Sequence, residues 1–355
     1  MVWGLKTTHR RAESLSRGLT AALALILLFS YVVLTGCRRR ASDKEDTTIT
    51  LYGFSVVKEP LENEIFPLFE KQWREKTAQQ LHFASSYAAS EIVTNQIVNG
   101  VETDIAILSI ERNAERLQRP DVTHSDWRWL PYGGIVNRTP MVIVVRQGNP
   151  KRIHDFRDLA KPGVKIIHCD PTSSGAGQWS LLAIYGSEVI KSDGRDGRHD
   201  RRLDNPAAQT LLRQLWKNVV ATPESARAAR TQFEQKEGDA LITYEMEALQ
   251  MKGKNQPVEI ITPPATVLCE HPVVIVDHLL TPQKYALVEL FVRTFWDRPA
   301  QEAWVRAGFR SMFDDLNRGF VKIEMPFKAG DLGGWAKIDK EIIEGVWKQT
   351  IQGGK

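Results

Sequence analysis

Short apolar runs alternate with amphipathic segments along most of the chain. The apolar runs are typical of buried strands, and we place strands at residues 48–52, 80–84, 104–108, 141–145, 164–167, 240–244, 258–261 and 273–276. Apolar residues three or four positions apart predict helices at residues 60–76, 88–98, 179–185, 206–217 and 225–236. Strands that alternate with helices predict an α/β fold with a mainly parallel sheet flanked by helices on both faces.

The pattern breaks in two places. Between residues 119 and 140 the periodicity lapses into a loop with several prolines and glycines, and a second α/β unit begins after it. Residues 192–198 interleave basic and acidic side chains with two glycines, which is typical of a solvated loop. The last hundred residues are expected to be mostly helical and to end in a polar tail.

The N-terminus has the layout of an export signal. A basic segment that ends at Arg17 is followed by an apolar stretch, and this stretch ends in Leu34, Thr35, Gly36 and Cys37. These four residues resemble a bacterial lipobox, in which the cysteine is lipidated and becomes the first mature residue. Residues 1–36 are then the signal peptide and residues 37–46 a charged tether. The alternative is an uncleaved membrane anchor, because the uncharged span is just long enough to cross a bilayer.

The charge of the chain excludes one class of function. The formal net charge is +4, but residues 1–36 contribute +3 of it, so the exported body is nearly neutral. Nucleic-acid-binding proteins usually show a concentrated basic face. We therefore expect no nucleic-acid partner.

Residues 169–179 (CDPTSSGAGQW) place small residues between an apolar strand and a helix. Such a turn presents backbone N–H groups and the positive end of a helix dipole, and together these bind anions. Similar turns occur at residues 54–56, 85–90 and 224–226. Crevices form beyond the carboxyl ends of parallel strands, so the four turns predict a ligand cradle; the alternative is that the serines are simply N-caps.

No catalytic motif is present. The sequence has no G-x-S-x-G elbow, P-loop, H-E-x-x-H or paired C-x-x-C, and its eight histidines lack metal-ligand spacing. With Cys37 assigned to the anchor, only Cys169 and Cys269 remain, and we leave them unpaired. His168 and Cys169 could form half of a nucleophilic dyad, but no third group that would orient them is identifiable. We expect no enzyme, no cofactor and no metal.

Three motifs carry a family resemblance: residues 149–164 (NPKRIHDFRDLAKPGV), 170–179 (DPTSSGAGQW) and 333–337 (GGWAK). Together they closely resemble the extracytoplasmic sulfate-binding proteins of ABC sulfate/thiosulfate importers, over residues 48–349. The resemblance implies a two-lobe periplasmic-binding-protein (type II, Venus-flytrap) fold, with each lobe a mainly parallel sheet flanked by helices. It places lobe I at residues 47–135 plus 271–355 and lobe II at 136–270, with crossover strands near 131–140 and 265–275.

The resemblance also implies a binding site for a dianionic oxyanion. In the family, backbone N–H groups at helix starts, one serine hydroxyl and one tryptophan N–H hold the anion. Matched motif by motif, the ligand-binding residues here are Val56, Ser90, Gly175, Ala176, Ala226 and Tyr244. Val56 replaces an aspartate that acts through its backbone, Ala176 replaces a glycine, and Tyr244 replaces the tryptophan.

The donor-only chemistry agrees with this assignment, because fully ionised sulfate has no proton to donate. Tyr244 departs from it, since a phenol can donate or accept, and we hypothesise that it relaxes the exclusion of protonated anions. The sequence thus predicts a monomeric, lipid-anchored protein outside the cytoplasm that delivers sulfate or thiosulfate to an ABC permease. The alternatives are another oxyanion, such as phosphate or molybdate, or an oxyanion sensor.

Overall fold

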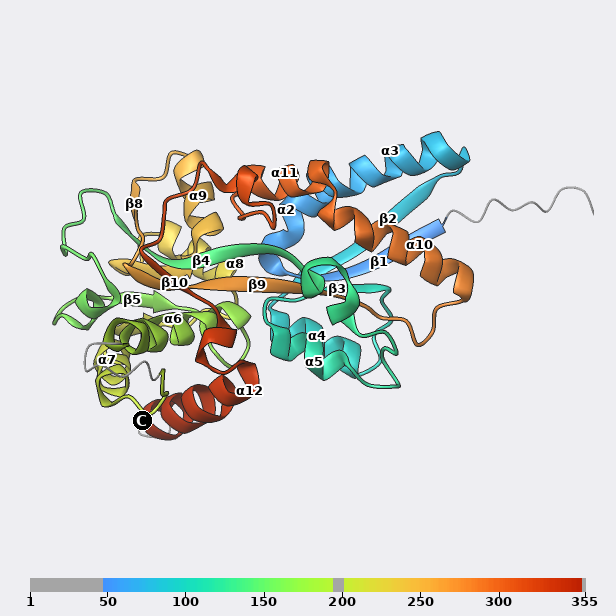
Figure 1. Cartoon of the computed structure of the whole chain (residues 1–355). Helices are drawn as coiled ribbons and strands as arrows, with labels where there is room; N and C mark the ends of the chain where they lie inside the picture. Colours follow the sequence, from blue (N-terminus) through green and yellow to red (C-terminus); the bar gives the residue numbers. More distant parts are fainter. Residues whose placement is uncertain (1–46, 194–200, 353–355) are drawn as a thin grey trace, which may run out of the picture. The chain divides into compact units, whose positions relative to one another are not determined.

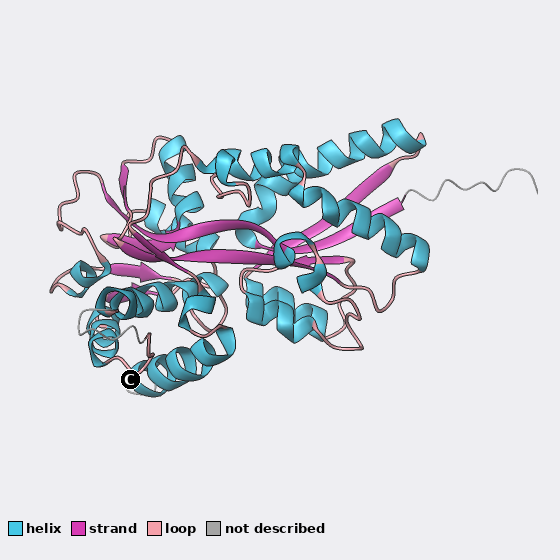
Figure 2. Ribbon diagram, in the orientation of Figure 1, coloured by secondary structure: helices cyan, strands magenta, loops and turns pink. Residues whose placement is uncertain are grey.

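A computed structural model of the chain describes residues 47–193 and 201–352. Helices cover the faces of a central sheet (Figures 1 and 2). The strands are β1 (Thr47–Phe54), β2 (Leu81–Ala88), β3 (Ile105–Ile107), β4 (Ile135–Arg146), β5 (Ile166–His168), β6 (Val219–Ala221), β7 (Ala240–Tyr244), β8 (Val258–Ile261), β9 (Ala265–Ile275) and β10 (Met325–Phe327). The predicted α/β class is confirmed.

The sheet is mixed. Its order is β2-β1-β3-β9-β4-β7-β5-β6, with β8 beside β4 and β10 beside β9. Strand β3 pairs in parallel with β1, and β5 pairs in parallel with β6 and β7. Strands β4 and β9 pair antiparallel with each other. Strand β4 also pairs antiparallel with β7, and β9 pairs antiparallel with β3. The alternation of strands and helices indicates the parallel pairs but not these antiparallel ones.

Strands β4 and β9 connect the two ends of the sheet. The first half of β4 pairs with β9 from Ile135↔Pro272 to Pro140↔Leu268, and its second half pairs with β7 and β8. The last residues of β9 pair with β3. The two long strands therefore run side by side, and Figure 1 shows them in the middle of the sheet.

The helices before residue 200 begin where the strands end. An almost continuous helical segment runs from Ser55 to Thr77 and includes a short 3-10 turn (η2, Ser55–Val57), α2 (Lys58–Pro60), a π turn (η3, Leu61–Ile65) and α3 (Phe66–Thr77). Helices α4 (Ser90–Val98), α5 (Glu111–Leu117) and α6 (Gly175–Ser192) follow β2, β3 and β5. Short 3-10 turns also occur at Trp127–Trp129, Pro131–Gly134 and Phe156–Ala160. The placement of each helix directly after a strand brings several helix N-termini to one side of the sheet.

The later helices include two that begin with Pro behind a capping side chain. Helices α7 (Pro206–Trp216) and α10 (Pro282–Arg293) are capped by Asn205 and Thr281. The others are α8 (Ala226–Glu234), α9 (Glu245–Gly253), α11 (Arg298–Arg306) and α12 (Trp335–Ile338), which continues into a π helix, η10 (Asp339–Gln352). Short 3-10 turns lie at Thr294–Trp296, Asp314–Asn317 and Ala329–Leu332.

Helix α6 lies deep in the core. Every residue from Gly175 to Val189 is buried, as expected of a helix that packs on all sides. The C-terminal helices help to enclose it, because Trp335 packs edge-on against Trp179 with ring centroids 4.7 Å apart. Similarly, Trp347 packs against Trp216 of α7 at 5.7 Å. The N-terminus of α6 is therefore rigidly placed.

Candidate functional site

A small cavity of about 10 Å³ lies where several helices begin. It is lined by Phe54, Ser55, Ala89, Ser90, Ser109, Ser174, Gly175, Ala176, Ser225, Ala226 and Tyr244. Among these lining residues none is charged, and six carry a hydroxyl group. The starts of α4, α6 and α8 contribute to the wall, so backbone N–H groups and helix dipoles are directed at the same small space.

The start of α6 is free of side-chain capping. Ser174 is its N-cap residue but makes no side-chain capping bond, and Ser173 instead donates its hydroxyl to Glu224 O at 3.0 Å. The first turn of α6 also contains no acidic residue. The alternative that these serines simply cap the helix is therefore wrong for α6, and its first N–H groups stay available to a ligand.

The start of α8 has a side-chain cap and also a backbone N–H group without an intrahelical partner. Ser225 accepts a hydrogen bond from Ala228 N at 3.1 Å, so here the N-cap interpretation holds. The cap uses one N–H group and leaves that of Ala226, one of the cavity-lining residues, without an intrahelical partner.

Ser90 begins α4 and is 2 % exposed. Its hydroxyl accepts a hydrogen bond from Ser109 N at 3.0 Å and donates one to Asn113 Oδ1 at 3.1 Å. Ser90 is thus fixed toward the cavity, and donation to a ligand would require its proton to leave Asn113.

Gly175 is required by a close approach. A Cβ built at this position would lie 2.2 Å from Ser109 Oγ and 2.7 Å from Ser109 Cβ, so a larger residue would force the two walls apart. Only glycine lets the start of α6 contact the turn after β3 this closely.

Tyr244 ends β7 and is almost fully buried. Its hydroxyl lies 2.8 Å from Ser109 Oγ, and either oxygen can be the donor. Desolvation raises the pKa of Tyr244 well above its ordinary value of 10, so the phenol keeps its proton. The residue that replaces the expected tryptophan therefore offers a neutral hydroxyl.

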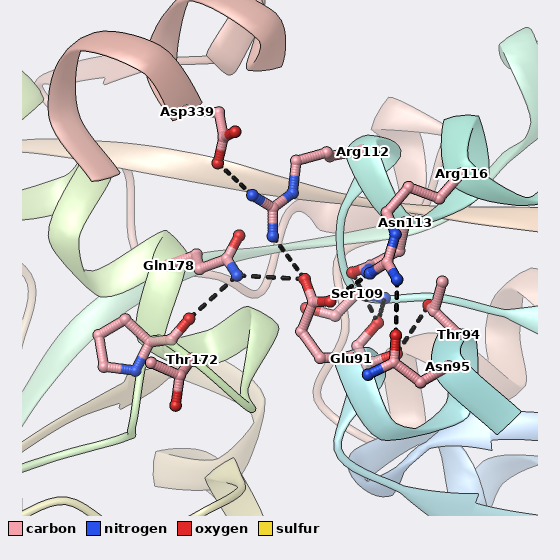
Figure 3. A network of polar contacts seen from close by, with 12 residues as sticks. Glu91, Thr94, Asn95, Ser109, Arg112, Asn113, Arg116, Thr172, Gln178 and Asp339 are labelled. Carbon is pink, nitrogen blue, oxygen red and sulfur yellow. Dashed lines mark hydrogen bonds and ion pairs between the residues drawn. The ribbon is translucent and has the colours of Figure 1, made fainter. Parts of the chain in front are cut away.

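Charges beside the cavity are neutralised by partners. Figure 3 shows Glu91, in the first turn of α4, held by Arg112 Nη2 at 2.6 Å, Arg116 Nη1 at 2.5 Å and Gln178 Nε2 at 3.2 Å. Burial raises the pKa of Glu91, but these arginines outweigh it and the pKa falls below 4.5. Arg112 also bonds Asp339 of the C-terminal helix.

Arg227 follows Ala226 but turns away from the cavity. Its guanidinium donates to Glu59 Oε2 at 2.8 Å and to Glu247 Oε1 at 3.1 Å. This cation beside the start of α8 is thus already paired, and the cavity-lining residues of α8 offer neutral donors to a ligand.

The structure brings five of the six expected ligand residues to one cavity: Ser90, Gly175, Ala176, Ala226 and Tyr244. Val56 is buried in η2 but does not line the cavity, whereas its neighbour Ser55 does. Cys37 lies outside the described residues. Sequence reasoning missed Ser109, because it follows a three-residue strand and lies in none of the serine-rich turns.

The buried thiols take no part in this site. Cys169 and Cys269 are both free and buried, as expected. Burial raises the pKa of Cys169 to about 12 and lowers the pKa of His168 to about 4, so the pair does not resemble an activated thiolate and its base. Within the part of the chain that the structure describes, no group of acidic, histidine or cysteine residues could hold a metal ion, and no helix is long and apolar enough to cross a membrane.

A sheet bridged by two long strands, with a small cavity of neutral donors where helices begin, defines a protein that binds a small solute. Comparison with known proteins agrees: residues 49–310 match the family model of bacterial extracellular solute-binding proteins. The chain belongs to this family, which places it outside the cytoplasm.

Individual relatives are similar over most of the chain. A sulfate-binding protein of Synechococcus elongatus is 29 % identical over 98 % of each chain. A thiosulfate-binding protein of Pseudomonas aeruginosa is 27 % identical over 80 % of this chain and 86 % of its own. Among solved structures, the sulfate-binding protein SubI of Mycobacterium tuberculosis superposes with a TM-score of 0.73 and 31 % identity, over 83 % of this chain and 99 % of its own.

Proposed function

We propose that this protein captures sulfate or thiosulfate outside the cytoplasm and delivers it to the permease of an ABC importer. The observation that carries the proposal is the composition of the cavity wall: helix N-termini and hydroxyl groups, without a charged side chain among the residues that line it. Several relatives named above carry sulfate or thiosulfate binding in their names.

The physical chemistry of the wall suits a small dianion. Helix dipoles and charge-assisted hydrogen bonds stabilise a negative charge without a cation in contact with it. The cavity is far smaller than the pockets of roughly 300–1,000 Å³ that hold drug-sized ligands, so a large ligand is excluded.

We assign the contacts as follows. The N–H groups of Gly175, Ala176 and Ala226 and the hydroxyls of Ser90 and Tyr244 donate to the anion. Val56, the residue that follows the cavity-lining Ser55 in η2, is the sixth proposed contact and acts through its N–H group.

The proposed mechanism is closure of two lobes around the anion. Lobe I comprises residues 47–135 and 271–334. Lobe II comprises residues 136–270 together with the segment from Trp335 onward, which packs against α6 and α7. Strands β4 and β9 form the hinge. Ser109 and Tyr244 come from different lobes, so their hydrogen bond marks the closed form. The permease recognises this closed form.

The remaining assignments concern the anchor and the activity. Cys37 carries the lipid that holds the mature protein at the membrane, and the protein acts as a monomer. It acts as a binding protein and not as an enzyme, in keeping with the solute-binding family to which it belongs.

Isothermal titration of the full-length protein in detergent tests the proposal. Sulfate, thiosulfate, phosphate and molybdate are compared at two pH values that span the second ionisation of phosphate. We expect sulfate or thiosulfate to bind more tightly than molybdate at both pH values. Tighter binding of molybdate than of sulfate and thiosulfate, or no measurable binding of any of the four anions, contradicts the proposal.

A further inference from the structure

Ser109 and Tyr244 form a hydroxyl pair in the wall of the cavity. Ser109 lies just after β3 and Tyr244 ends β7, and their oxygens are 2.8 Å apart. Both residues line the cavity and both are 1 % exposed.

The surroundings of Ser109 hold it in this position. Its N–H group donates to Ser90 Oγ at 3.0 Å, and its carbonyl accepts from Trp179 Nε1 at 2.7 Å. The Cα of Gly175 packs against its side chain so closely that a Cβ there would lie 2.2 Å from Ser109 Oγ. The main chain of Ser109 is therefore fixed, and its hydroxyl faces Tyr244.

The phenol ring of Tyr244 is equally constrained. It packs edge-on against Phe54, with ring centroids 6.4 Å apart, and against His271 at 5.6 Å. Because burial keeps the phenol protonated, the pair consists of two neutral hydroxyls, each with one proton and two lone pairs.

One of the two protons forms the bond between the hydroxyls, and the other remains free. The pair therefore presents to the cavity one donor and at least one acceptor lone pair, whichever oxygen donates. A backbone N–H group or an indole N–H offers no lone pair. The pair thus gives the cavity wall a proton acceptor that the helix N-termini do not supply.

We propose that the Ser109–Tyr244 hydroxyl pair is a specificity-determining element that lets the cavity bind a tetrahedral oxyanion carrying one proton, such as hydrogen phosphate, besides a proton-free dianion such as sulfate. The inference rests on the proposed function. With hydrogen phosphate, the ligand O–H donates to one hydroxyl of the pair, this hydroxyl donates to the other, and the second donates to another ligand oxygen. With sulfate, the first oxygen accepts nothing and the other bonds stay the same.

The experiment is calorimetric titration of the full-length protein with sulfate and with phosphate at pH 8, where phosphate is mainly a singly protonated dianion. We expect wild type to bind phosphate within about 100-fold of sulfate, a difference of about 2.7 kcal/mol. Tyr244→Phe and Ser109→Ala should each raise the ratio of the phosphate Kd to the sulfate Kd by at least about tenfold. The double variant should raise it no further than the stronger single variant, because the two hydroxyls act as a unit.

Ser180→Ala is the matched control. Its hydroxyl is buried in the same helix as Gly175 but bonds Ala176 O at 2.8 Å and does not line the cavity. The control should bind both anions as wild type does, and thermal unfolding of every variant checks its fold.

Two failures are distinguishable. Tight sulfate binding with phosphate rejected by wild type, or a ratio that both variants leave unchanged, overturns the inference and leaves the proposed function standing. If neither sulfate nor thiosulfate binds, the proposed function fails. The inference then survives only if phosphate binds and if Tyr244→Phe and Ser109→Ala weaken phosphate binding while Ser180→Ala does not. Otherwise the inference fails as well.

Discussion

Individual residues around the cavity carry more than one role. Ser90 both faces the cavity and accepts the hydrogen bond that holds Ser109. Gly175 supplies an N–H group and, by lacking a Cβ, lets Ser109 approach. A substitution of Ser90 therefore removes a hydrogen-bond donor, whereas a substitution of Gly175 disturbs the close packing against Ser109.

Ser90→Ala should weaken sulfate binding by about 1–3 kcal/mol, the scale of a hydrogen bond to a charged group. The variant also leaves Ser109 N without its acceptor, so a small loss of thermal stability is expected. Titration calorimetry measures the effect, and unchanged affinity would remove Ser90 from the site.

Gly175→Ala should weaken sulfate binding by at least about tenfold, or 1.4 kcal/mol, because the new Cβ collides with Ser109. Gly253→Ala is the control, since a Cβ at Gly253 meets no heavy atom within 4 Å. Equal affinities for the two variants would show that the close approach is not needed for binding.

At the scale of elements, the C-terminal helices support the site from behind. Trp335 packs on Trp179, and the indole of Trp179 holds the carbonyl of Ser109 at 2.7 Å. An element at the far end of the sequence thereby stabilises the start of α6 and the turn after β3.

Trp335→Ala should destabilise the fold by about 3–5 kcal/mol, as is usual for a buried tryptophan. Trp129→Ala, at a side chain that is 86 % exposed, should change stability by no more than about 0.5 kcal/mol. Urea unfolding followed by circular dichroism compares the two. A small effect of Trp335→Ala would mean that the C-terminal helices do not hold α6 in place.

At the scale of the whole molecule, two fully buried histidines link folding to pH. Desolvation lowers the pKa of His168 to about 4 and that of His271 to about 3, from an ordinary value of 6.5. Between the ordinary pKa of 6.5 and these lowered pKa values, the histidines of the unfolded chain bind protons that the histidines of the folded chain do not.

The free energy of unfolding should therefore fall as the pH drops from 6.5 toward 4, by about 1.4 kcal/mol per pH unit for each histidine. Their contribution to stability is fully present above pH 6.5. Urea unfolding at several pH values measures the slope, and His271→Gln should reduce it by about half. A stability that stays constant between pH 6.5 and 5 contradicts the lowered pKa values.

Much of this protein follows from local sequence pattern. The periodicity of apolar residues predicts β7 and β8 with their observed bounds and places α4, α7 and α8 within about three residues. The small-residue turns mark the helix starts that meet at the cavity, because a missing side chain and a free N–H group are properties of the residues themselves.

The tertiary structure decided the rest. Residues 135–140 lie in the stretch where the periodicity lapses, and only the family resemblance indicated a crossover strand there. They form the first half of β4, where β9 supplies the hydrogen-bond partners. Ser109 and Tyr244 are 135 positions apart, and Arg227 meets Glu59 over 168 positions. Such contacts depend on which strands pair and how helices pack, and they leave no periodic trace in the sequence. The sequence by itself determined which turns could bind an anion. Only the folded chain decided that the hydroxyl of Ser109 lies beside that of Tyr244 and that Glu91 near the cavity is paired with arginines, because both depend on contacts between distant segments.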